Sequence, residues 1–245
     1  MSILSLLVLE RARRAALVFA FGAALPVLAQ AALPGALPDT IAQRVLACTA
    51  CHAAKERSDA FFPDIAGKPA GYLYNQLINF REGRRQYPLM TYMVDHLPDP
   101  YLRELADYFS TLRPQQHPAP QPASAPAAVL GRGRTLVMLG DPAKKVPACI
   151  ACHGEKLSGV APAIPGLLGL PRDYINAQFG AWKNRVRRAN APDCMANIAA
   201  RLSDADVAAV SGWLATQVAP PNVGPATSIT LPLPLECGSV PPPDK

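Results

Sequence analysis

The sequence predicts an all-α protein built from two tandem helical domains. Three observations lead to this prediction: an internal repeat across most of the chain, helix-start signals at matching places in both halves, and no convincing strand pattern. At 245 residues the chain is long enough for one large domain or two small ones. Aromatic residues make up only 7% of the chain, which limits ordinary core building, so we expect each small domain to wrap around a flat apolar group.

The pentapeptide Cys-x-x-Cys-His occurs once in each half. It is the attachment signal of c-type haem, in which two thiols bind the porphyrin vinyl groups and the histidine ligates the iron. A zinc site would leave both histidines unexplained, and a thioredoxin-like dithiol needs a strand–helix–strand pattern. The two copies therefore predict two covalently attached haem c groups and a function in electron transfer. The predicted attachment residues are Cys48, Cys51, His52, Cys149, Cys152 and His153.

The N-terminus has the features of an export signal. A basic cluster at residues 11–14 precedes an apolar run at residues 15–29, and Ala29-Gln30-Ala31 fits a small-x-small cleavage site. The run is short for a membrane span, although an uncleaved anchor stays open as an alternative. We expect a mature chain in the periplasm, cleaved after about Ala31.

The chain is basic, with a formal charge of +6. Part of this excess is expected to serve the four propionates of two haems. Nucleic-acid binding is the usual alternative for a basic protein, but it does not suit an exported haem protein.

The two halves align well beyond the haem motifs. Segments 63–72 and 165–174 share Pro, Gly, Pro and Tyr at identical offsets, and blocks 90–97 and 195–202 both begin with Met and end with Leu. Such self-similarity predicts that each half folds as one copy of the same unit. The aromatic residues expected to pack on the haems are Tyr72, Phe80, Tyr174 and Trp182.

Each half is expected to contain, in order, an opening helix, the haem motif, a loop, a middle helix, a methionine loop and a closing helix. The opening helices are predicted at about 40–47 and 128–139, and the middle helices begin near the repeated tyrosines. The closing helices begin at Asp99-Pro100, with Asp99 as the cap, and at Ser203, whose partner three residues on is Asp206.

Proline-rich segments separate and follow the two units. Such composition is typical of extended linkers and of tails that lie over a surface. The predicted organisation is a signal peptide at 1–31, a first domain at 32–113, a Pro/Ala-rich linker at 114–127, a second domain at 128–218 and a Pro-rich tail at 219–245.

On these motifs the chain resembles dihaem class I c-type cytochromes, and most closely the cytochrome c4 group. The resemblance covers about residues 40–218 and includes both haem motifs, the Pro-x-x-x-Gly-x-Pro-x-x-Tyr segments, residues 140–144 and the two methionine blocks. It implies two tandem class I cytochrome c domains, each around one haem, in a periplasmic electron carrier.

The resemblance also implies the axial ligands of the two irons. His52 and His153 would be the proximal ligands, and Met90 and Met195 the distal ligands. A thioether sulfur favours Fe(II), so His/Met ligation raises the reduction potential.

Two other side chains compete for the first iron. Met93 aligns with Ile198, which cannot ligate a metal, so Met93 is interpreted as a packing residue. His96 would give a bis-His site, but its counterpart is Arg201, which indicates a solvated position.

Arginines cluster between each middle helix and the following methionine block. A charge run usually marks a solvated face, but some of these side chains could pair with haem propionates, and both interpretations stay open. The residues are Arg84, Arg85, Arg185, Arg187 and Arg188.

Two cysteines lie outside the haem motifs. Cys194 directly precedes Met195, and Cys237 lies in the tail. In an oxidising compartment they are candidates for a disulfide, which would pin the tail against the methionine block of the second haem and restrict access of water.

The leading functional prediction is a soluble electron carrier, not an enzyme. It would cycle both irons between Fe(III) and Fe(II) by outer-sphere transfer, between a dehydrogenase or quinol-linked donor and a terminal acceptor. The runner-up is the cytochrome subunit of a periplasmic oxidoreductase complex, such as a dehydrogenase. A dihaem peroxidase needs an open distal position, and a methionine in both halves argues against it. The expected partners are redox proteins, with peripheral association to membrane complexes as an option.

Overall fold

The fold is described from a computed structural model of the whole chain. The structure describes residues 38–52, 62–113, 120–122, 125–219, 223–227 and 232–241. The predicted export signal and parts of the linker and tail lie outside the described residues. Residues Thr40–Lys245 form one compact unit that contains both halves of the repeat.

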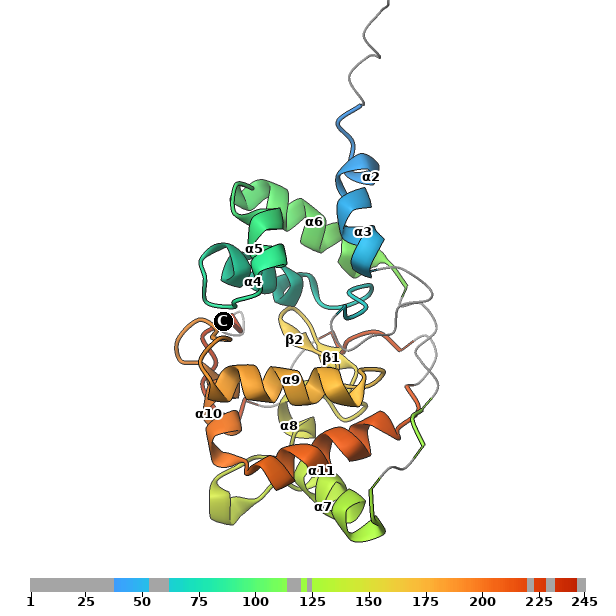
Figure 1. Cartoon of the computed structure of the whole chain (residues 1–245), viewed down its shortest axis with the longest axis vertical. Coiled ribbons are helices and arrows are strands. Elements are labelled where there is room, and N and C mark those ends of the chain that lie inside the picture. The colour runs from blue at the N-terminus through green and yellow to red at the C-terminus, as the bar shows by residue number, and fades with distance from the viewer. Residues whose placement is uncertain are drawn as a thin grey trace, which may run out of the picture. The chain divides into compact units, whose positions relative to one another are not determined.

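The described part of the first half contains five helices. Figure 1 labels them α2 to α6. The core of this half lies where α4 packs on α6, around the buried side chains of Leu73, Leu105 and Phe109. These side chains recur at helical spacing on α4 and α6, so each helix presents an apolar stripe to the other. The elements are α2 (Ile41–Arg44), α3 (Leu46–His52), α4 (Ala70–Arg81), α5 (Pro88–Val94) and α6 (Asp99–Thr111).

The second half repeats this order and adds a small hairpin. Strands β1 and β2 pair antiparallel, with Gly159 opposite Pro165 and Val160 opposite Ile164. At two residues each they are too short to leave an alternating pattern in the sequence. The elements are α7 (Ala127–Met138), the 3-10 helix η1 (Pro142–Lys144), α8 (Ile150–His153), β1 (Gly159–Val160), β2 (Ile164–Pro165), α9 (Arg172–Lys183), α10 (Cys194–Arg201) and α11 (Asp204–Ala215).

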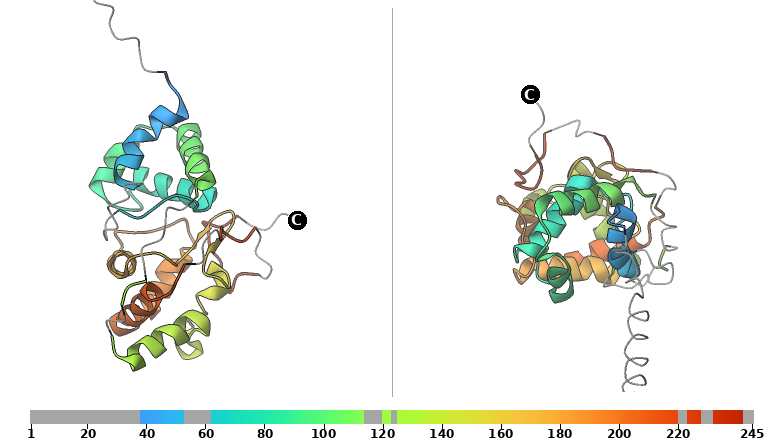
Figure 2. Two further views of the ribbon diagram at one scale, coloured as in Figure 1. Left: turned by 90° about the vertical axis from the view of Figure 1, so that its right-hand side faces the viewer. Right: turned by 90° about the horizontal axis from the view of Figure 1, so that it is seen from above.

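The core of the second half lies where α7 crosses α11, as two further views show (Figure 2). The crossing is close because Gly133 has no side chain: a Cβ atom there would lie 2.1 Å from the carbonyl oxygen of Ala209. Leu136, Val137 and Val210 are at most 2% exposed around this contact.

The start of α11 is held by a capping box and an ionic cluster. Ser203 Oγ accepts a hydrogen bond from the backbone N–H of Asp206 at 3.1 Å, as the sequence predicts. The Asp206 carboxylate also accepts from Arg132 Nε at 2.9 Å and from Lys144. Arg132 in turn donates to Asp141 at 2.6 Å, so α7, η1 and α11 meet at one cluster of charges.

The predicted cap at Asp99 is wrong. Pro98 is the N-cap of α6, and Asp99 is the first residue of the helix. The Asp99 carboxylate instead accepts hydrogen bonds from Arg81 at 2.6 Å and from Tyr74 at 3.2 Å. Arg81 of α4 thus competes for the carboxylate that would otherwise cap the helix. Arg81 lies 18 residues earlier in the chain, so the sequence around residue 99 does not indicate this contact.

Two antiparallel backbone hydrogen bonds join the halves. The N–H of Gln86 donates to the carbonyl of Val186, and the N–H of Arg188 donates to the carbonyl of Arg84, both at 2.7 Å. The pairing places the segment after α4 beside the segment after α9, which are equivalent segments of the repeat. Among the described residues, no helix is long and apolar enough to cross a membrane.

Candidate haem-binding sites

A largely apolar cavity of about 200 Å³ lies in the second half. Its wall contains Cys149, Cys152 and His153 from the second haem motif, together with Met195 at the start of α10. The structure therefore brings the predicted attachment residues and the predicted methionine ligand to one cavity. Apolar side chains that also line it are Leu136, Val146, Ile175, Phe179, Ile198 and Leu202.

Both motif histidines are oriented by a backbone carbonyl. His153 Nδ1 lies 2.8 Å from the carbonyl oxygen of Pro165, and His52 Nδ1 lies 2.9 Å from that of Pro63. A carbonyl can only accept, so Nδ1 carries the proton and Nε2 keeps the lone pair that a metal needs. The two prolines begin the repeated segments 63–72 and 165–174. Their repetition indicates a shared role, but the sequence alone does not show that their carbonyls contact the histidines.

The histidines are also kept neutral by their surroundings. Burial lowers the pKa of His153, and burial together with the nearby charge of Arg85 lowers the pKa of His52. A neutral imidazole is the form that ligates iron. Burial acts on the thiols as well: it raises the pKa of Cys149 to about 12 and raises the pKa of Cys152.

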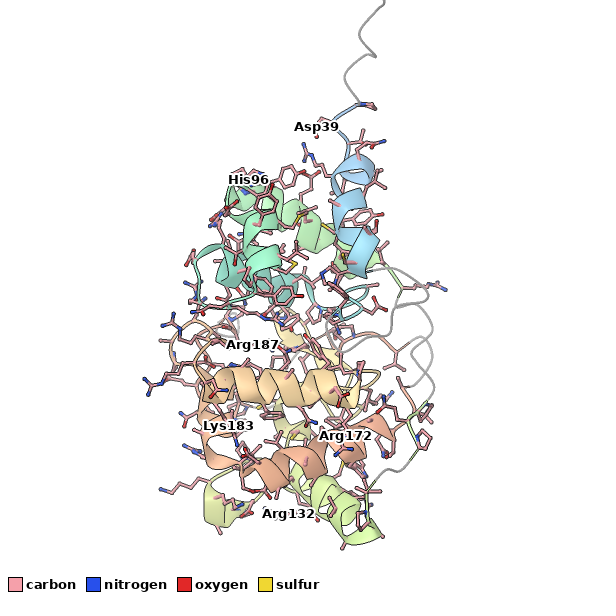
Figure 3. All side chains as sticks on the ribbon, in the orientation of Figure 1. Asp39, His96, Arg132, Arg172, Lys183 and Arg187 are labelled. Atoms are coloured by element: carbon pink, nitrogen blue, oxygen red, sulfur yellow. A yellow bond between two sulfur atoms is a disulfide. The ribbon has the colours of Figure 1, made fainter. Side chains whose placement is uncertain are left out.

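Two arginines bridge the halves beside the cavity: Arg187 lines it, and Arg85 contacts residues that line it. Arg187, only 7% exposed, donates to Gln178 at 2.7 Å and to Gln76 of the first half at 3.2 Å (Figure 3). Arg85 donates to Gln76 and to Gln178, both at 2.9 Å, and to Tyr174 at 3.3 Å. Among the described residues, neither guanidinium has an ion pair with a carboxylate. We call Arg85, Arg187, Gln76 and Gln178 the arginine cluster.

The cavity fits a haem on two counts. A buried cation pair is costly without an anion, and the propionates of a haem would supply one beside the arginine cluster. Burial, followed by repulsion from Arg85, lowers the pKa of Arg187, as expected for cations that lack a counter-charge. The indole N–H of Trp182 is buried in the cavity wall without a hydrogen-bond partner in the described part of the chain, and a propionate oxygen would accept from it.

The five arginines singled out in the sequence lie in different environments. Arg85 and Arg187 belong to the arginine cluster. Arg187 is buried, so a solvated face is the wrong interpretation for it. Arg84 donates to Asn79 at 2.6 Å and pairs with Glu82, whereas Arg185 and Arg188 are exposed.

The methionine segments are helices rather than loops. Met90 lies in α5, and Met195 is the second residue of α10. Met90 and Met93 pack on the same core cluster, which contains Ile78, Phe80 and Leu102. Residues 53–61, which follow His52, lie outside the described residues.

His96 lies away from this core. Its side chain is 72% exposed and its Nδ1 lies 3.0 Å from a carboxylate oxygen of the neighbouring Asp95 (Figure 3). This is the solvated position that its alignment with Arg201 indicates.

The expected disulfide between Cys194 and Cys237 is present. The N–H of Gly238 donates to the carbonyl of Pro192 at 2.9 Å, and Asn75 of α4 donates to the carbonyl of Ser239 at 2.9 Å. Leu235, Cys237, Ser239 and Val240 line the cavity. Residues 232–241, which we call the tail strap, therefore form one wall of the second site and also contact the first half.

No known family profile matches the chain, but individual proteins do. It is 40% identical over 177 residues to the thiosulfate dehydrogenase electron acceptor of Thiomonas intermedia, covering 71% of this chain and 80% of that protein. It is 32% identical over 170 residues to cytochrome c4 of Pseudomonas aeruginosa, covering 68% of this chain and 82% of the relative. The chain belongs to the cytochrome c4 family. Its members are dihaem c-type cytochromes, so this one carries two covalently attached haem c groups and transfers electrons.

Solved structures agree with this assignment to the cytochrome c4 family. Reduced cytochrome c4 from Pseudomonas stutzeri aligns with a TM-score of 0.60 and 28% identity, over 71% of this chain and 95% of that one. Thiosulfate dehydrogenase from Marichromatium purpuratum aligns with a TM-score of 0.61 and 30% identity, over 69% of this chain but only 36% of that one. The predicted all-α fold of tandem class I cytochrome c domains is confirmed, whereas the domain boundaries and the axial ligands remain predictions.

Proposed function

We propose that this cytochrome accepts electrons from an enzyme of the thiosulfate dehydrogenase type, through two irons ligated by His52 and Met90 and by His153 and Met195. The observation that supports the histidine ligands is the hydrogen bond from each Nδ1 to a proline carbonyl, which leaves Nε2 for iron. Met195 is supported by its place in the same cavity as His153. The donor is suggested by the relative from Thiomonas intermedia, which is named as the electron acceptor of such an enzyme.

In this function the protein holds each haem and sets its reduction potential. Bound haem supplies a one-electron Fe(III)/Fe(II) couple. Leu136, Ile175 and Phe179 keep the cavity wall apolar, which disfavours the extra charge of the ferric state. A methionine sulfur as sixth ligand acts in the same direction and leaves no open position for a substrate. A carrier, not an enzyme, is what these residues support.

The test is reduction of the oxidised holoprotein by the thiosulfate dehydrogenase of Thiomonas intermedia under anaerobic stopped-flow conditions. With thiosulfate present, both haems are expected to become reduced, one electron each. Mixtures that lack either the enzyme or thiosulfate are the controls. Reduction no faster than in these controls would refute the proposed donor.

A second candidate is a freely diffusing carrier, as opposed to a subunit bound permanently to the dehydrogenase. It is favoured by the relative from Pseudomonas aeruginosa, whose name, cytochrome c4, mentions no dehydrogenase. Size-exclusion chromatography of the protein mixed with the dehydrogenase separates the two: co-elution indicates a permanent subunit, and separate peaks with fast electron transfer indicate a free carrier.

We further propose that the chain works in the periplasm. The support is the basic cluster and apolar run that precede Ala31, because such a segment directs export. Intact-mass measurement of protein from a periplasmic extract is expected to show loss of about residues 1–31. A full-length mass in the membrane fraction would instead indicate a retained anchor.

A further inference from the structure

Exposed apolar side chains gather on the helix that carries Met90. Leu89 and Tyr92 of α5 are 48% and 73% exposed, and Tyr87, the N-cap of α5, is 37% exposed. Leu89 and Tyr92 are three residues apart, so they lie on the same side of the helix. Met90 points to the core cluster instead, so the helix carries the proposed iron ligand inward and an apolar surface outward.

The exposed surface continues into the second half. Val186 is 39% exposed, and its carbonyl accepts the N–H of Gln86, the residue next to Tyr87. Arg185 beside it is also exposed, which adds a cation at the edge. We call Tyr87, Leu89, Tyr92, Val186 and Arg185 the methionine-side patch.

The second half has no such patch on its own methionine helix. Cys194 aligns with Leu89, but its sulfur is bonded to Cys237 of the tail strap. Asn197 aligns with Tyr92 and is polar. In the described part of the chain, the tail strap thus covers the methionine side of the second site, whereas Tyr87, Leu89 and Tyr92 stay exposed on the methionine side of the first half.

We infer that the methionine-side patch is the docking surface of the electron-donating enzyme, whose contact surface is apolar with an acidic rim. The identity of that donor rests on the proposed function. Tyrosines at the centre of a small apolar surface are typical of protein contacts, and an arginine at the rim steers an acidic partner. Docking here places the donor against the helix that holds Met90, so electrons enter at the first haem.

The test compares rate constants for reduction by the thiosulfate dehydrogenase of Thiomonas intermedia in excess thiosulfate. The patch variants are Leu89→Asp, Tyr92→Asp and Arg185→Glu. The matched control is Leu139→Asp, because Leu139 is 75% exposed but lies at the end of α7, outside the patch. Each variant is first checked for the methionine-to-ferric-iron charge-transfer band, and a variant that has lost it is replaced by Leu89→Ser or Tyr92→Ser.

The aspartate variants are expected to lower the second-order rate constant by roughly tenfold or more, and the Leu139 control to leave it unchanged. Arg185→Glu is expected to slow the reaction at low ionic strength and to approach the wild-type rate at high ionic strength, because salt screens rim charges.

Three results would overturn the inference. Patch variants that react like the Leu139 control would show that the donor docks elsewhere, while the proposed function stands. A wild-type dimer that dissociates in the patch variants by analytical ultracentrifugation would assign the surface to a second copy of the chain. Absence of wild-type reduction would refute the proposed function and this docking surface together.

Discussion

His52 and His153, the proposed proximal ligands, are each oriented by a single hydrogen bond. Each imidazole donates a hydrogen bond from Nδ1 to a proline carbonyl, so the ring is held in one tautomer and one orientation. The haem motif alone predicts the histidine but not this partner, because the partner lies 11 or 12 residues further along the chain.

Replacing the proposed distal ligands one at a time tests their assignment. Met195→Ala is expected to lower the potential of the second haem by on the order of 100 mV, because a water or hydroxide oxygen, which favours Fe(III), replaces the thioether. Met90→Ala should do the same to the first haem. Spectroscopic redox titration reports both potentials and the charge-transfer band. Met93→Ala is the matched control; if it removes the band and Met90→Ala does not, the ligand is Met93.

Asp206 gives a prediction about pH. Burial by itself would raise the pKa of this carboxyl, but hydrogen bonds from Lys144, Ser203 and Arg132 hold the pKa well below its usual range. An acid with a lowered folded-state pKa stabilises the fold above its unfolded pKa of about 3.9 and loses that contribution as the pH falls towards the folded value.

Asp206→Asn is therefore expected to reduce stability by about 1–3 kcal/mol at pH 7, and the difference from wild type should shrink between about pH 5 and pH 3. Denaturant titration followed by far-ultraviolet circular dichroism measures it. Asp204→Asn is the control, because its side chain is 98% exposed. A difference that stays constant down to pH 3 would contradict the role given to the Asp206 charge.

At the scale of elements, the tail strap is held at three points. The disulfide joins it to the first residue of α10, Gly238 donates to Pro192, and Asn75 holds Ser239. A Cβ atom at Gly238 would lie 2.1 Å from the carbonyl oxygen of Ala191, so the strap approaches the preceding segment closely. Cys194, the residue before Met195, is thereby bonded to the tail strap, which forms one wall of the cavity in the second half.

Removing the Cys194–Cys237 disulfide should affect the second haem only. The double variant Cys194→Ser, Cys237→Ser is expected to lose about 3–4 kcal/mol of stability, because the bond closes a loop of 43 residues. It should also let imidazole displace Met195 at the second haem at lower concentrations than in wild type, with the first haem unchanged. Optical titration with imidazole and thermal unfolding measure the two effects. Equal imidazole affinities in the variant and wild type would show that the strap does not guard the site.

Most elements agree with their sequence predictions, and the exceptions have physical causes. The opening helix of the second half is predicted at 128–139 and found at Ala127–Met138, because its apolar pattern and its limits are local features. The cap at Asp99 fails because Arg81, on another helix, takes the carboxylate. The β1–β2 hairpin is missed because two-residue strands carry no periodicity.

At the scale of the whole molecule, the arginine cluster joins the two haem-binding halves. Each guanidinium donates to a glutamine of its own half and to the equivalent glutamine of the other half. The arrangement places two cations where the halves meet, beside the cavity of the second half. A cation near a porphyrin disfavours the ferric state, so we expect the cluster to raise the potential of the second haem.

Removing one of these cations should shift the potentials. Arg187→Gln is expected to lower the potential of the second haem by about 40–60 mV, equivalent to ~1 kcal/mol, because the lost cation had favoured the ferrous state. The interval between the two haem potentials should change as well. Spectroscopic redox titration measures both, with Arg185→Gln as the control because Arg185 is exposed. Identical potentials in wild type and the Arg187 variant would argue against the cluster as the partner of the propionates.

The sequence by itself determined the number of haems and the repeated helical unit, and it predicted the six attachment residues and the disulfide. The haem motifs and the helices depend on residues that are close in the chain or that recur in the repeat, whereas the disulfide was predicted from the two cysteines outside the haem motifs. Only the tertiary structure decided which arginines become buried, which carbonyl orients each histidine, and which residue of the first half the tail contacts. Arg85 meets Gln178 and Asn75 meets Ser239 only after the halves and the tail have packed, and contacts between such distant residues leave no periodic or local trace in the sequence.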